Sequence, residues 1–86
     1  MSYRVEWSER ADAELSAAWH ATADWPPFLT AVQSAGFELE SHPLDVGESR
    51  DDDTLRVGFF PPLTIYFAVS PEERLVRIVH VVAPQD

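Results

Sequence analysis

The stretch LRVGFFPPLTIYFAVSPEERLVRIVHVV, residues 55–82, decides the fold. Apolar residues alternate with other residues over 55–59 and over 63–69, which is the period of a half-buried β-strand. Residues 75–82 are apolar on nearly both faces, and turn-forming residues separate the three segments. The stretch therefore predicts three antiparallel strands in a meander.

The same alternation predicts which side chains are buried. A shift of one residue in the pairing would move the whole apolar set to the other face, so the register should be well specified. We expect the sheet face that the helices cover to carry Leu55, Val57, Phe59, Ile65, Phe67 and Val69. Arg56 and Tyr66 should lie on the opposite face.

The segment before the meander predicts one strand and two helices. Residues 2–7 alternate like a short strand, and Ser8 is a favourable N-cap for an amphipathic helix over 9–21. A second helix should begin near Pro26 and end at His42, because proline suits a first helical turn and Pro43 disfavours helix before it.

These elements together predict an α+β fold. Residues 45–53 lack periodicity and should form the connecting loop, which includes the acidic run 51–53. The expected order is an N-terminal strand, a two-helix hairpin and the three-stranded antiparallel meander, with the helices on one face of the sheet. A chain of 86 residues has room for a single domain, residues 1–86.

Composition excludes several classes of function. The chain has no cysteine, which removes disulfides, thiolate nucleophiles and cysteine-based zinc sites. No segment resembles a signal peptide or a spanning helix, so we expect a cytoplasmic protein with no membrane partner. The formal charge is -9 and all six basic residues are arginine, so free nucleic acid is an unfavourable ligand.

A small arginine and tyrosine patch is the main candidate binding site. The face opposite the helices should present Arg4, Arg56 and Tyr66, with Arg77 beside them. The arginines could hold a phosphate or carboxylate and Tyr66 could stack or move a proton, but an ordinary solvated sheet face would carry the same residues. Trp25, between the two helices, is the candidate contact for a partner protein.

The remaining polar residues indicate no catalytic or metal site and no cofactor. His20, His42 and His80 lie far apart and do not form an HExxH zinc motif. His80 stands in an apolar run, where a partnered structural imidazole is the more common role and a general base is the alternative. The acidic run 51–53 lacks the ligand spacing of a calcium loop.

The order and spacing of the elements resemble the RelE/ParE superfamily of bacterial toxins. The resemblance rests on the Tyr3-x-Val5-x-Trp7 strand, the alanine-rich helix ending near Trp19, His42-Pro43 with Gly47 and Arg50, and the strands 63–69 and 76–81. It implies either cleavage of mRNA on the ribosome, as in RelE-type members, or inhibition of gyrase, as in ParE-type members.

The resemblance also implies that the nuclease residues are missing, as in a divergent member. Thr64 stands where a RelE-like pattern has arginine, Ala83 and Pro84 stand where it has a basic pair, and no tyrosine follows Tyr66. We therefore expect a toxin-like protein that acts by binding protein: an antitoxin or a second copy at an open sheet edge, with a gyrase-type enzyme as one candidate target. A ribosome-dependent endoribonuclease and a non-toxic orphan interaction module are the alternatives.

Overall fold

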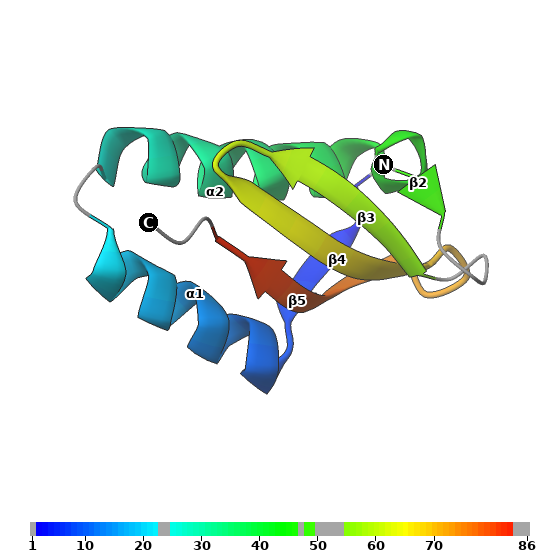
Figure 1. Cartoon of the computed structure of the whole chain (residues 1–86). Coiled ribbons are helices and arrows are strands. Elements are labelled where there is room, and N and C mark those ends of the chain that lie inside the picture. The colour runs from blue at the N-terminus through cyan, green and yellow to red at the C-terminus, as the bar shows by residue number, and fades with distance from the viewer. Residues whose placement is uncertain (1, 23–24, 47, 50–54, 84–86) are drawn as a thin grey trace.

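The computed structural model describes residues 2–22, 25–46, 48–49 and 55–83 (Figure 1). Along the chain it contains β1 (Arg4–Trp7), α1 (Glu9–Ala21), α2 (Trp25–Ser41), a 3₁₀ turn η1 (Pro43–Asp45), β2 (Glu48–Ser49), β3 (Leu55–Phe60), β4 (Leu63–Ser70) and β5 (Leu75–Val82). The α+β order is confirmed, and both predicted helix positions are correct.

The strands form one mixed sheet in the order β1-β5-β4-β3-β2 over the described residues. The meander of β3, β4 and β5 is antiparallel, whereas β1 pairs with β5 in parallel at the edge. Two parts of the predicted loop over 45–53 belong to regular elements: Asp45 ends η1, and β2 pairs with β3 opposite Arg56 and Val57. The acidic run 51–53 lies outside the described residues.

Both helices contribute to one core against one face of the sheet. Ser8 caps α1 as predicted, because its Oγ accepts a hydrogen bond from the Ala11 N–H at 3.0 Å. The buried apolar residues are Ala11, Phe28, Ala31, Ala35, Leu39, Phe60, Leu63, Ile65, Phe67, Val69, Val76, Ile78 and Val81. β4 shows the strict alternation expected of a strand with one covered face.

The predicted facing of β3 is wrong. Phe60 lies opposite Leu63 and Arg56 lies opposite Phe67, so β3 turns Arg56, Gly58 and Phe60 toward the helices. The reason is the two-residue connection Pro61-Pro62, which fixes the pairing of Phe60 with the fully buried Leu63. Leu55, Val57 and Phe59, which looked like core residues, lie on the open face.

Gly58 explains how this face of β3 fits into the core. A Cβ atom at this position would lie 2.9 Å from Cε2 of Phe60 and 3.3 Å from Cε1 of Phe67. Any other residue would push against these two rings, so only glycine lets them close over the strand. Arg56 sits at the rim of the same face, where its Nε donates a hydrogen bond to the Val46 carbonyl at 3.1 Å.

Candidate functional site on the open sheet face

The open face of the sheet brings together three of the four residues predicted to form a patch. Arg4 lies on β1, Tyr66 on β4 and Arg77 on β5, and the strand pairing puts them on the face away from the core. Arg56 is not among them, because it lies on the helix-facing side of β3. The face also carries Leu55, Val57 and Phe59.

The two arginines of this face share one carboxylate. Glu6 Oε2 lies 3.2 Å from Arg4 Nε, and Glu6 Oε1 lies 3.4 Å from Arg77 Nη2. All three side chains are substantially exposed, so each pair contributes at most about 1 kcal/mol to stability. The shared partner offsets one of the two positive charges, which weakens this surface as a binding site for phosphate.

His80 is the functional candidate that the sequence left open, and the structure places it beside Tyr66. A β-bulge interrupts the pairing of β4 with β5: Tyr66 faces His80, Phe67 faces Ile78, and Val79 is the extra residue. Regular alternation from the buried Ile78 would have turned His80 into the core. The extra residue instead brings His80 to the face of Tyr66, and the two rings lie 5.3 Å apart.

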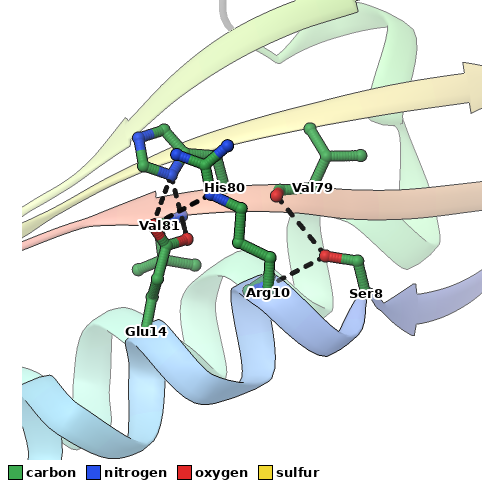
Figure 2. A network of polar contacts seen from close by, with 7 residues as sticks. Ser8, Arg10, Glu14, Val79, His80 and Val81 are labelled. Atoms are coloured by element: carbon green, nitrogen blue, oxygen red, sulfur yellow. Dashed lines mark hydrogen bonds and ion pairs between the residues drawn. The ribbon is translucent and has the colours of Figure 1, made fainter.

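Glu14 of α1 holds the imidazole of His80 (Figure 2). Nδ1 of His80 lies 2.9 Å from Oε1 and 2.7 Å from Oε2 of this carboxylate. Oε1 also accepts the backbone N–H of Val81 at 2.9 Å. Glu14 therefore supplies the hydrogen-bond acceptor that a neighbouring strand would otherwise offer to the Val81 N–H of β5.

The position of α1 follows from the short length of β1. β1 ends at Trp7 opposite Ile78, and the Ser8 N–H donates to the Ile78 carbonyl at 2.9 Å. The rest of β5 has no β1 residue beside it, and α1 runs along this part of the strand (Figures 1 and 2). This path brings Glu14 to the backbone of Val81.

Several neighbours shift the pKa of Glu14. Burial of the carboxylate would by itself raise the pKa of Glu14, whereas the Val81 N–H, His80 and Arg10 lower it. The net result is a pKa below the ordinary value of 4.5. Glu14 is thus held as a carboxylate, the form that accepts hydrogen bonds from both groups.

The sequence carries only a weak signal for Glu14. Ala11 and Ala18 stand three residues before it and four residues after it, and both lie in or against the core, so Glu14 is an acidic residue on the sheet-facing side of α1. A carboxylate there needs a partner, but the pattern does not name one. Because the partner is 66 residues away and reaches Glu14 through a bulge, sequence spacing could not reveal the contact.

The arrangement of Glu14, His80 and Tyr66 has the geometry of an acid–base group. A carboxylate on Nδ1 orients the ring and leaves Nε2 as the nitrogen not held by Glu14, and the aromatic ring of Tyr66 packs beside the imidazole. Within the described ranges, no three His, Asp or Glu side chains lie close enough to hold a metal ion. No helix among these residues is long and apolar enough to cross a membrane.

Trp25 is exposed, as predicted, but it is tied to the junction of the two helices. Its side chain is 49% exposed and stacks on Trp19 of α1 with ring centroids 4.9 Å apart. Its Nε1–H donates to the Thr22 carbonyl at 3.0 Å. The contacts account for the position of the indole, so exposure alone does not mark it as a partner contact.

Comparison with known proteins identifies the class of fold. No protein-family model matches the chain, and no curated protein sequence matches it. The toxin–antitoxin complex RelBE2 from Mycobacterium tuberculosis is similar in structure, with a TM-score of 0.80 at 18% identity over 100% of this chain and 95% of that one. The chromosomal ParDE system of P. aeruginosa gives 0.70 at 14% identity, covering 96% and 97%.

The intact E. coli RelBE complex is similar as well, with a TM-score of 0.69 at 16% identity over 98% of this chain and 99% of that one. The likeness spans the two helices and the mixed sheet. The chain therefore has a RelE/ParE-like fold, which confirms the fold that the sequence resemblance implied.

Proposed function

We propose that this protein is the toxin component of a type II toxin–antitoxin pair and that it acts in the cytoplasm by binding other proteins. One partner is an antitoxin, and the target is a gyrase-type enzyme. The observation that carries the proposal is the likeness, over essentially the whole chain, to proteins solved as toxin–antitoxin complexes. Fold alone does not choose a target.

The open face favours a protein target over RNA. Its two arginines pair with Glu6, Arg56 lies on the other side of the sheet, and the chain carries a formal charge of -9. Binding to a phosphate backbone depends on displacing counterions with unpaired positive charge. The same face exposes apolar area, with Phe59 71% exposed, which suits contact with another protein.

A growth experiment tests the proposed function. Induced expression in a bacterial host should arrest growth, and co-expression of the small protein encoded next to it should restore growth and give a stable complex by size-exclusion chromatography with light scattering. Purified protein should inhibit DNA supercoiling by gyrase. Normal growth on induction would instead indicate a non-toxic orphan module, if the protein is also a monomer that binds neither the product of the adjacent gene nor gyrase.

RNA cleavage is the second candidate function, and the oriented His80 beside Tyr66 is the observation that favours it. A general acid–base pair can move the proton of an attacking 2′-hydroxyl, but the developing charge also needs unpaired cations. We expect only background cleavage of mRNA on programmed ribosomes, because the two arginines described on this face, Arg4 and Arg77, both pair with Glu6. Cleavage that His80→Ala abolishes and the control Arg56→Ala retains would move the protein into the enzyme class.

A further inference from the structure

An open groove of about 660 Å³ lies between the C-terminal half of α2, η1 and the end of β3. It is separate from the Tyr66–His80 site, which lies on β4 and β5. The lining residues are Ser34, Glu38, His42, Asp45, Val46, Phe59 and Phe60. They come from two stretches of chain, 34–46 and 59–60, that meet only in the folded protein.

The groove combines an apolar wall with acidic sides. Phe60 is buried at its base, while Phe59 is 71% exposed, the largest exposed fraction among the large apolar side chains described. Leu44, beside the groove in η1, is 47% exposed. Solvent-exposed aromatic side chains in a hollow are the usual anchors of a protein interface.

The charged residues described in the groove are mainly acidic. Glu38 and Asp45 contribute carboxylates, and no arginine is among the described residues that line the groove. Among the described lining residues His42 is the one basic group, and its Nε2 lies 2.6 Å from Oε2 of Glu38. Arg4 and Arg77 pair with Glu6, Arg10 pairs with Glu14, and Arg56 donates a hydrogen bond to the Val46 carbonyl.

We propose that this groove binds a basic, partly apolar segment of a protein partner. An apolar side chain of the segment packs on Phe59 and Phe60, and a lysine or arginine pairs with Glu38 or Asp45. The inference rests on the proposed function in so far as that function is protein binding. A second copy of this chain is a poor occupant, because two molecules of charge -9 repel each other.

The test is a titration of ¹⁵N-labelled protein with a short synthetic peptide that alternates leucine with arginine, followed by amide chemical shifts. Shifts should cluster at the groove residues of α2, η1 and β3. A peptide with glutamate in place of arginine should bind at least about tenfold more weakly, because its charge is reversed. Equal binding of the two peptides would overturn the proposal, as would no shift at millimolar peptide.

Two sets of variants localise the binding. Glu38→Gln with Asp45→Asn should weaken the basic peptide about tenfold, and Phe59→Ala should weaken it without unfolding the protein. The matched control, Glu9→Gln with Asp12→Asn, removes the same charge from the exposed start of α1 and should leave binding within about twofold. An equal loss in the control would mean that net charge, not the groove, drives binding.

The outcome is separable from that of the growth experiment. If an antitoxin complex forms with unchanged affinity in the Glu38→Gln, Asp45→Asn variant, the groove proposal fails and the proposed function stands. If the peptide binds in the groove but expression leaves growth normal, the proposed function fails and the groove proposal stands. Shifts that map to Tyr66 and His80 instead would move the binding surface to the open sheet face and overturn the assignment to the groove.

Discussion

Phe60→Ala should lower the free energy of unfolding by about 3 to 5 kcal/mol, a large part of the stability of so small a chain. Phe60 is 8% exposed, and its ring closes over Gly58 in the core. Alanine would leave a cavity there, because Gly58 has no side chain to fill the space. Phe60→Leu, which should lose only about 1 to 2 kcal/mol, keeps the comparison measurable if the alanine variant does not fold.

The neighbouring residue is the control. Phe59→Ala should change the free energy of unfolding by no more than about 0.5 kcal/mol, because the ring is 71% exposed on the open face. Urea unfolding followed by tryptophan fluorescence measures both variants. A larger loss of unfolding free energy for Phe59→Ala than for Phe60→Ala would mean that Phe59 and not Phe60 faces the core. That result would refute the pairing of Phe60 with Leu63.

Glu14→Ala is expected to have the next largest effect, a loss of about 1 to 3 kcal/mol in the free energy of unfolding. The variant leaves the N–H of Val81 without an acceptor on a residue that is 5% exposed, and it also frees His80 Nδ1. Alanine is itself a good helix former, so the loss cannot come from helix propensity. An unchanged midpoint in urea would show that water replaces the carboxylate at no cost.

The contribution of Glu14 should depend on pH. Its pKa in the folded protein lies below the ordinary value of 4.5, so the folded state binds a proton less readily than the unfolded state. The stabilisation is complete above that ordinary pKa and is lost as the pH falls through the folded value. Glu14→Gln keeps an acceptor for Val81 but no charge, so it should flatten the acid limb of the stability curve.

An exposed carboxylate gives the reference for this measurement. Glu72→Gln changes a residue of the exposed turn before β5 and should leave the acid limb as it is in the unaltered protein. Stability would be measured by urea unfolding across the acid range. Equal flattening by Glu72→Gln and Glu14→Gln would mean that overall charge, and not the contact with Val81, sets the response.

Local patterns were sufficient for most of the fold. The cap at Ser8, the proline pair at the start of α2 and the proline after His42 all act within a few residues, so the helix ends could be read from neighbours in sequence. The alternation of β4 was equally reliable, because one face of this central strand is fully covered.

The errors arose where the pattern was ambiguous or the contact distant. β3 carries large apolar side chains on both faces, so alternation alone could not tell Phe59 from Phe60; the two-residue link to Leu63 could have done so. The site at His80 depends on a bulge, which shifts the alternation by one residue without a mark in the sequence. Its partner Glu14 is joined to it only by tertiary structure.

The parallel pairing of β1 with β5 also sets an order of events during synthesis. Arg4 pairs with Leu75 and Trp7 with Ile78, so β1 gains its partner strand only after β5 has been made. The links within β3, β4 and β5 are short, whereas closing this contact requires most of the chain in between. Until β5 has left the ribosome, Val5 and Trp7 have no strand beside them, so this edge of the sheet can form only after residue 78 has been synthesised.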